Sequence, residues 1–226
     1  MKKSIPFIGV AVGAAIAMTS CYGNKGGSAE LKDSNDSLSY SIGVAMAEDF
    51  KQAKIEGLNL DLLLKGLKDH QDSTAVIELI DADAYIREQL SQRANKEAIE
   101  SGTKFLEENK GKEGVQTTAS GLQYKILSQG TGIKPDANDS ITVHYEGKLI
   151  DGNIFDSSIK RGAPVTFPLN QVVAGWTEGF QLLSEGTKAM FYIPSSLGYG
   201  ERDNGVIPPH STLIFEVELI KVYKVD

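Results

Sequence analysis

Tyr145, Phe155 and Asp156 are the residues of this 226-residue chain whose types and spacing first suggest chemistry. Tyr145 lies on one face of an alternating run that begins at Ile141, as in a strand with one buried face. The turn sequence Asp151-Gly152 then brings Phe155 and Asp156 back toward that strand. A phenol, an aromatic ring and a carboxylate are therefore predicted to share one neighbourhood.

Common enzymatic and binding motifs are missing from the sequence. The single cysteine, Cys21, lies far from Tyr145, and no Gly-x-Ser-x-Gly, Walker or dinucleotide-binding pattern is present. The three histidines, His70, His144 and His210, do not have ligand spacing, so we expect no metal and no cofactor. The formal net charge of −7 argues against a general affinity for nucleic acid, because phosphate binding depends on clustered Lys and Arg.

Five short blocks in the C-terminal half resemble, in the same order, the FKBP family of peptidyl-prolyl cis-trans isomerases. They are Val143-His144-Tyr145-Glu146-Gly147, Phe155-Asp156-Ser157-Ser158, Val172-Val173-Ala174-Gly175-Trp176, Tyr199-Gly200 and Val206-Ile207-Pro208-Pro209-His210-Ser211-Thr212-Leu213. The resemblance implies an enzyme that speeds rotation about X–Pro bonds in proline-containing unfolded or exported polypeptides. It also implies a pocket that a macrolide inhibitor could fill.

Rotation about an X–Pro bond needs no nucleophile. Amide resonance gives the rotation a barrier of about 18–20 kcal/mol, and the uncatalysed switch takes roughly tens to hundreds of seconds. Conjugation is lost in the twisted transition state, so a dry apolar pocket tolerates that state better than the planar amide. Aromatic and aliphatic walls can therefore promote this reaction.

The resemblance also implies roles for the site residues. Trp176 would form the floor under the proline ring, and the Tyr199 hydroxyl and the Val173 amide could donate to substrate carbonyls. The catalytic residues would be Tyr145, Asp156 and Tyr199, and the substrate-binding residues Phe155, Arg161, Val165, Val172, Val173, Trp176, Ile207 and Phe215.

Several of these residues have alternative interpretations. Asp156 would orient or polarise the twisting amide while Arg161 or Tyr145 holds it, or it merely caps the turn at Ser157-Ser158. Arg161 could instead be an ordinary surface charge. The aromatic residues could be plain core, because rings at strand and helix spacing usually are.

Two features depart from the best-known FKBPs. Val165 stands where an aromatic wall is often found, and residues 201–205 differ in content. Substrate preference and inhibitor affinity therefore stay open. A second class of function also stays open, namely a chaperone or peptide-binding module with incidental isomerase activity.

Residues 1–21 have the pattern of a lipoprotein signal peptide. Lys2-Lys3 precede an apolar run over residues 5–17, and Met18-Thr19-Ser20-Cys21 resembles a bacterial lipobox. We expect lipidated Cys21 to anchor the protein in the bacterial cell envelope, at the outer membrane and facing the periplasm. A conventional cleavage site with an incidental thiol is the alternative. Residues 22–36, rich in Gly, Ser, Asn and Lys, would be a flexible tether.

Residues 37–73 are predicted to form two short amphipathic helices. An apolar stripe from Tyr40 to Phe50 recurs at helical spacing after a cap at Ser37, and the leucines of Leu60–Leu67 make a second apolar face. Both segments resemble the N-terminal dimerisation region of FKBPs of the macrophage-infectivity-potentiator type, which implies a homodimer. A small bundle within one chain is the alternative.

Residues 74–113 favour one long helix, because they contain no proline and are rich in Ala, Glu, Lys, Gln and Arg. The apolar stripe of this segment is thin and lacks sustained heptads, so we predict a mostly solvated linker helix rather than a coiled coil.

Residues 114–226 would be the isomerase domain, with the signals of an α+β fold. A helical pattern containing Trp176 and Phe180 interrupts a series of strands. The strands are predicted at Leu122–Ile126, Ile141–Leu149, Val165–Leu169, Met190–Ile193 and Leu213–Val222. We predict a twisted antiparallel sheet wrapped over one short helix.

Overall fold

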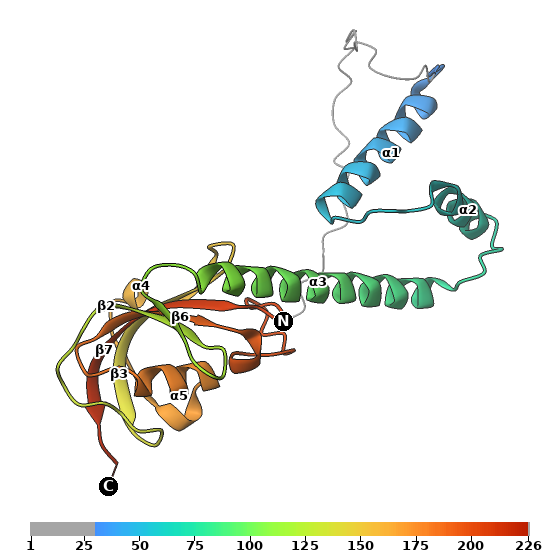
Figure 1. Ribbon diagram of the computed structural model, residues 1–226. Coiled ribbons are helices and arrows are strands. Elements are labelled where there is room, and N and C mark those ends of the chain that lie inside the picture. Colours follow the sequence, from blue (N-terminus) through green and yellow to red (C-terminus); the bar gives the residue numbers. More distant parts are fainter. Residues whose placement is uncertain (1–29, 226) are drawn as a thin grey trace. The chain divides into compact units, whose positions relative to one another are not determined.

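Residues 30–225 are described by the computed structural model (Figure 1). Their contacts divide the chain into two compact units, one ending at Val76 and the other starting at Ile77. The predicted signal peptide with Cys21, and the first part of the predicted tether, lie outside the described residues. Within residues 30–225, no helix has the length and apolar character that crossing a bilayer requires.

The first unit contains two helices, α1 (Ser34–Gln52) and α2 (Leu60–Gln71). The side chain of Asp33 caps α1, because its carboxylate accepts from two backbone N–H groups of the first turn. The predicted cap at Ser37 is therefore wrong. The helix also begins inside the stretch that was predicted to be tether.

Neither α1 nor α2 buries a residue. Large apolar side chains on both helices are more than half exposed, namely Leu38, Tyr40, Ile42, Val44, Leu60, Leu62, Leu64 and Leu67. The two helices thus present apolar faces that no other element of their own unit covers.

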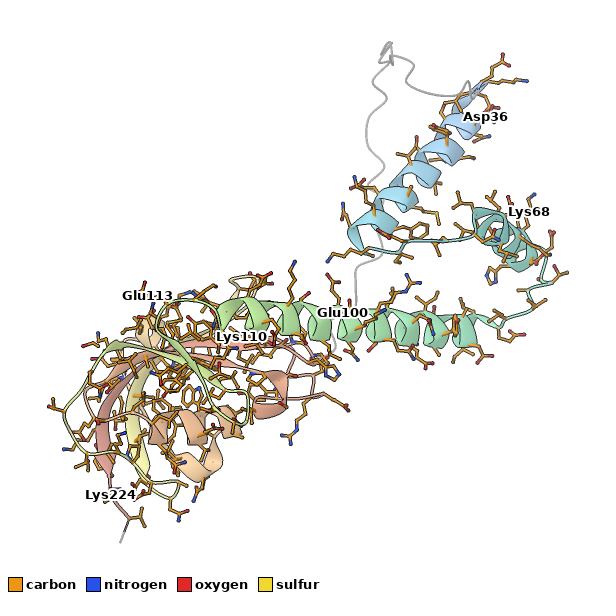
Figure 2. All side chains as sticks on the ribbon, in the orientation of Figure 1. Asp36, Lys68, Glu100, Lys110, Glu113 and Lys224 are labelled. Carbon is orange, nitrogen blue, oxygen red and sulfur yellow. The ribbon has the colours of Figure 1, made fainter. Side chains whose placement is uncertain are left out.

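The second unit begins with a long helix, α3 (Leu79–Asn109), which is shorter at both ends than the predicted range 74–113. Its side chains up to Glu100 are mostly exposed (Figure 2). Gly102 and Asn109 are the buried residues of the helix. The two parts of α3 therefore have different surroundings.

The C-terminal part of α3 packs against the sheet of the same unit, which the sequence patterns did not predict. Asn109 is buried and donates to Oε1 of Gln123 at 2.9 Å, and Gln123 donates to the carbonyl of Leu106 at 2.8 Å. Gly102 lies so near Thr212 that a Cβ atom would come within 2.4 Å of the Thr212 Oγ1 atom. This end of the helix is fixed to the domain that it precedes.

Seven strands form one antiparallel sheet in the order β1-β2-β6-β7-β3-β4, with β5 paired to β3. They are β1 (Val115–Thr117), β2 (Gln123–Ser128), β3 (Ser140–Leu149), β4 (Ile154–Ser157), β5 (Val165–Pro168), β6 (Lys188–Ile193) and β7 (Leu213–Tyr223). The predicted α+β class is confirmed. Periodicity missed β1 and β4 because strands of three and four residues are too short to show alternation.

The sheet folds over α5 (Ala174–Gln181), as Figure 1 shows. Trp176 and Phe180 of α5 are buried in the core, where the Phe180 ring meets the fully buried Phe191 of β6 at 5.3 Å. Gly179 permits this close packing, because a Cβ atom there would lie 2.8 Å from the Phe191 ring. The remaining short elements are α4 (Ser158–Arg161), η1 (Leu169–Gln171) and η2 (Ser195–Leu197).

Candidate active site

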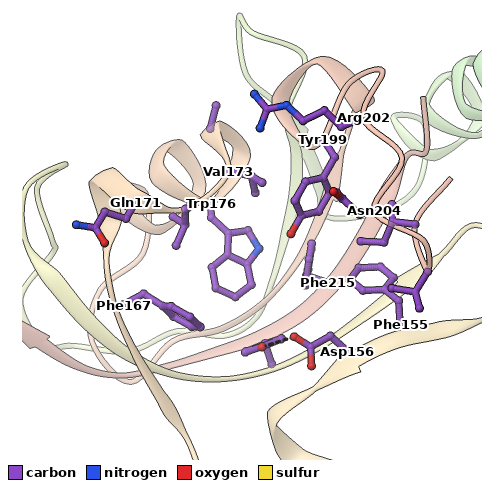
Figure 3. A pocket seen from close by; sticks show the side chains of 16 residues that line it. Phe155, Asp156, Phe167, Gln171, Val173, Trp176, Tyr199, Arg202, Asn204 and Phe215 are labelled. Atoms are coloured by element: carbon purple, nitrogen blue, oxygen red, sulfur yellow. Dashed lines mark hydrogen bonds between the residues drawn. The ribbon is translucent and has the colours of Figure 1, made fainter. Parts of the chain in front are cut away.

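A pocket of about 860 Å³ opens where β3, β4, β5 and β7 meet the start of α5 and the loop that follows η2 (Figure 3). Its lining residues are Tyr145, Phe155, Asp156, Phe167, Gln171, Val172, Val173, Ala174, Trp176, Gly198, Tyr199, Arg202, Asn204, Val206, Ile207 and Phe215. The volume falls in the range of about 300–1,000 Å³ that is usual for sites that bind small ligands.

Trp176 lies at the centre of this pocket and is only 5% exposed. Its ring centroid is 5.0 Å from that of Tyr145, 5.1 Å from that of Phe215 and 5.6 Å from that of Phe167, each in an edge-to-face arrangement. The buried Nε1 atom of Trp176 has no hydrogen-bond partner within the described residues. Ring packing rather than hydrogen bonding therefore fixes the orientation of the indole.

Gly147 allows two aromatic walls of the pocket to meet. This residue of β3 pairs with Asp156 of β4 on one side and with Phe215 of β7 on the other. A Cβ atom at Gly147 would lie 2.6 Å from the Phe215 ring and 2.7 Å from the Phe155 ring. Because glycine has no Cβ atom, the Phe155 and Phe215 rings pack edge to face with their centroids 5.5 Å apart. The absence of a side chain at this position is thus part of the shape of the pocket.

Tyr145, Asp156 and Arg161 form a polar cluster at the side of the pocket. The Tyr145 hydroxyl donates to Oδ2 of Asp156 at 2.5 Å and accepts from Nη2 of Arg161 at 2.8 Å, while Nη1 of Arg161 donates to Oδ1 of Asp156. Burial opposes ionisation of Asp156, but the hydrogen bonds from Tyr145 and Arg161 outweigh it and lower the pKa of Asp156 below 3.8. Burial and the hydrogen bond to Asp156 raise the pKa of Tyr145 above 10.0. At neutral pH the site therefore holds a carboxylate beside a neutral phenol.

Comparison with known proteins identifies the family. The family described as FKBP-type peptidyl-prolyl cis-trans isomerase matches residues 131–220, and the domain that lies amino-terminal to such isomerases matches residues 35–126. A probable FKBP-type peptidyl-prolyl cis-trans isomerase FkpA of Neisseria meningitidis is 46% identical over 201 residues, covering 81% of this chain and 73% of the relative. The chain belongs to the FKBP-type peptidyl-prolyl cis-trans isomerases.

Other similar proteins cover most of this FKBP-type isomerase. The outer membrane protein MIP of Legionella longbeachae is 40% identical over 232 residues, which span 96% of this chain and 95% of the relative. The crystal structure of FkpA from Escherichia coli aligns with a TM-score of 0.60 at 29% identity, covering 87% of this chain and 100% of that one. The family and the enzyme class that the five sequence blocks predicted are confirmed.

The two serines after Asp156 shape the turn of the FKBP domain that holds this carboxylate. Ser157 caps α4 by accepting from the Lys160 N–H at 3.2 Å. Ser158 is fully buried, and its hydroxyl accepts from the Tyr145 N–H at 2.8 Å. One interpretation of the sequence was that Asp156 merely caps this turn. In the structure Ser157 makes the cap, and the Asp156 carboxylate bonds to Tyr145 and Arg161.

The FKBP pocket brings nine of the eleven predicted site residues together. The two exceptions are Arg161 and Val165. Arg161 does not line the pocket, but it bonds to both Asp156 and Tyr145 and is not an isolated surface charge. Val165 packs against the hydrophobic core instead of lining the pocket, and the lining residue of this strand is Phe167.

Sequence reasoning missed several lining residues of the isomerase. Phe167 could have been found, because it shares a strand face with Val165, two residues earlier. Gln171 ends the three-residue helix η1, and Arg202 and Asn204 lie in an irregular loop, so no periodicity indicates the direction of these side chains. Within residues 30–225, no group of three or more His, Cys, Asp or Glu side chains is arranged to hold a metal ion.

Proposed function

We propose that this isomerase binds a proline of an unfolded or exported polypeptide over Trp176 and eases rotation of the preceding amide without a covalent step. The observation that carries the proposal is a rigid aromatic floor beside an ionised carboxylate. An amide that enters this pocket gives up water, and the planar form loses more hydration than the twisted form because its carbonyl is more polarised. The pocket thereby lowers the barrier relative to water.

Tyr145, Asp156 and Tyr199 are the proposed catalytic residues. Asp156 would face the twisting amide, because its hydrogen bonds with Tyr145 and Arg161 keep it ionised and fix its direction. Preorganised groups of this kind need no rearrangement as the amide twists. In this proposal no proton is transferred.

Two donors on the pocket wall support a role in binding the peptide backbone. Within the described residues, the Tyr199 hydroxyl and the Val173 N–H donate to no protein acceptor, although both residues line the pocket. Substrate carbonyls on either side of the proline would satisfy them. The other substrate-binding residues of the proposal are Phe155, Val172, Ile207 and Phe215, with Arg161 acting through Asp156.

The test is the cis/trans exchange rate of a short proline peptide, measured by NMR with the full chain. Trp176→Ala should lower catalysed exchange by about tenfold or more, and Asp156→Asn should lower it while leaving the fold intact. Tyr85→Ala, which truncates an exposed ring on α3, is the matched control. A macrolide that fills the pocket should suppress the remaining exchange. Unchanged exchange in Trp176→Ala would contradict the proposed site.

A second candidate activity is holding unfolded chains as a chaperone. The exposed apolar faces of α1 and α2 favour it, because any part of these faces that a second copy leaves uncovered could bind apolar client segments. If this activity is separate, Asp156→Asn should slow proline-limited refolding of a test protein but still protect that protein against aggregation.

We also propose that the N-terminal helices pair two copies of the chain into a homodimer. The support is that α1 and α2 bury no residue, whereas a dimer would cover their leucines. Analytical ultracentrifugation of a chain beginning at Lys25 tests this proposal. A monomer at micromolar concentration would contradict it.

A lipid on Cys21 would anchor this dimer in the bacterial cell envelope, at the outer membrane and facing the periplasm. The support is the lipobox pattern of residues 18–21 and the similarity to a protein named outer membrane protein MIP. Cells given labelled palmitate should label the natural protein but not Cys21→Ser. Equal labelling of both would exclude Cys21 as the lipidation site.

A further inference from the structure

Charge is unevenly distributed in the pocket. Of the sixteen lining residues, Asp156 and Arg202 are the two whose side chains are charged at neutral pH. Asp156 is paired with Arg161, so its charge is compensated. Arg202 forms no salt bridge within the described residues. The pocket therefore carries one uncompensated cation.

The neighbours of Arg202 do not neutralise it. Glu201 and Asp203 flank it in sequence, but neither lines the pocket. The Asp203 carboxylate instead accepts from the Gly205 N–H at 2.8 Å within its own loop. A carboxylate that arrives with the substrate would thus find the guanidinium free.

Arg202 lies on the side of the pocket opposite Asp156. In Figure 3, Arg202 is on the same side of Trp176 as Tyr199, and Asp156 is on the other side. The Arg202 N–H also donates to the Tyr199 carbonyl at 3.2 Å. This hydrogen bond holds the backbone of Arg202 beside that of Tyr199, so both side chains project from one loop at the rim of the pocket. The Tyr199 hydroxyl is proposed to bind a carbonyl next to the proline.

We propose that Arg202 is a specificity-determining residue, which favours substrates with Glu or Asp directly next to the proline. This inference rests on the proposed function, because it requires the proline to bind over Trp176. A guanidinium matches a carboxylate with two parallel hydrogen bonds and repels a Lys at the same place. Since Arg202 is exposed, we expect a modest preference, about three- to fivefold in kcat/KM for Glu over Gln.

The experiment measures exchange in two series of proline peptides by NMR with the full chain, which avoids a coupled protease that has its own charge preference. One series carries Glu, Gln or Lys before the proline, and the other carries them after it. In at least one series the natural enzyme should rank Glu above Gln above Lys. Arg202→Gln should bring the Glu/Gln ratio of kcat/KM near one, and Arg202→Glu should reverse it.

A matched control removes the same charge elsewhere. Lys134→Gln acts on an exposed lysine that does not line the pocket, and it should keep the Glu/Gln ratio of the natural enzyme. High salt should shrink the ratio, because exposed charges are screened. Arg202 does not determine specificity if the natural enzyme shows no preference for Glu over Gln in either series, or if Arg202→Gln retains that preference. If the Gln peptides themselves are not accelerated, the proposed function has failed instead.

Discussion

The two units of the chain differ in what their apolar side chains touch. In the unit that starts at Ile77, Phe180 and Phe191 are fully buried in one core. In the unit that ends at Val76, Leu62 is 65% exposed and neither helix buries any residue. Both units have regular apolar spacing in their sequences. Spacing therefore defines an apolar face, whereas burial depends on whether a partner for that face lies within the same unit.

The difference has an energetic consequence. Burying a leucine side chain stabilises a fold by about 1.5–3 kcal/mol, and neither helix of the first unit fully buries a leucine through its own contacts. Helices as short as α1 and α2 are marginal in water without tertiary packing. We therefore expect the second unit to hold its structure by itself and the first unit to need an external surface, which the proposed dimer would supply.

Separating the units should give the largest effect. Residues 77–226 alone should unfold cooperatively and keep exchange activity on a short peptide within about twofold of the full chain, because their core is complete. Residues 30–76 alone should lose nearly all helical circular dichroism on dilution and regain it as concentration rises. A helical, concentration-independent 30–76 fragment would mean that the first unit has its own source of stability.

Gly147→Ala should produce the next largest effect. The added Cβ atom would lie 2.6 Å from the Phe215 ring and 2.7 Å from the Phe155 ring, so the walls of the pocket must separate. Overpacking of this kind typically costs about 1–3 kcal/mol, and we expect a value near the upper end because two rings are involved. Chemical denaturation measures the loss, and peptide exchange should fall with it. A fully stable variant would show that the rings can move apart freely.

The same comparison explains how far the sequence could predict the structure. The strands around Tyr145 and Phe215 were predictable because each alternates over several residues. The packing of α3 against the sheet was not, because it depends on Gly102 and Asn109, which have no periodic partner. Short polar and glycine contacts between distant segments leave no local pattern.

The candidate site divides in the same way. The motif blocks contain four aromatic residues of the lining, because each block holds its residues on one strand, turn or helix; these are Tyr145, Phe155, Trp176 and Tyr199. Phe167 lies outside the blocks and was missed. Val165 was expected to line the pocket, but the lining residue of its strand is Phe167, which shares the same strand face. The motif indicates the strand and its face but not which position along the strand reaches the pocket. Arg202 could not be predicted, because the direction of a loop side chain depends on tertiary packing.

Asp139→Asn should have a smaller effect that depends on pH. Asp139 is 2% exposed and accepts from the N–H groups of Asp136 and Val225 and pairs with Lys224 at 2.9 Å. The hydrogen bond from the Asp136 N–H, with those from Val225 and Lys224, outweighs burial and lowers its pKa from 3.8 to about 2. Asparagine cannot accept all three donors, so we expect a loss of about 1–2 kcal/mol at pH 7.

The sign of the pH dependence follows from the lowered pKa. The ionised Asp139 stabilises the fold fully above about pH 4 and loses this effect as pH falls toward 2. The difference in unfolding free energy between the natural protein and Asp139→Asn should therefore shrink over that range. Denaturation midpoints at pH 7, 4 and 2.5 measure it. Glu100→Gln, in an exposed pair with Lys96 on α3, is the control and should cost only a few tenths of a kcal/mol at pH 7. A difference that is constant with pH would show that Asp139 acts through packing rather than charge.

Gly66→Ala should give the smallest effect, with a sign opposite to that of Gly147→Ala. A Cβ atom at Gly66 would meet nothing within 4 Å, and alanine in a helix interior is favoured over glycine by about 0.5–1 kcal/mol. We therefore expect a small rise in the unfolding midpoint of the first unit. Circular dichroism of the 30–76 fragment at high concentration measures this midpoint. If the midpoint falls instead, a second chain must approach the backbone of α2 at Gly66. The first unit would then depend on close packing, as the second unit does. Its packing partner, however, would be a second copy of the chain.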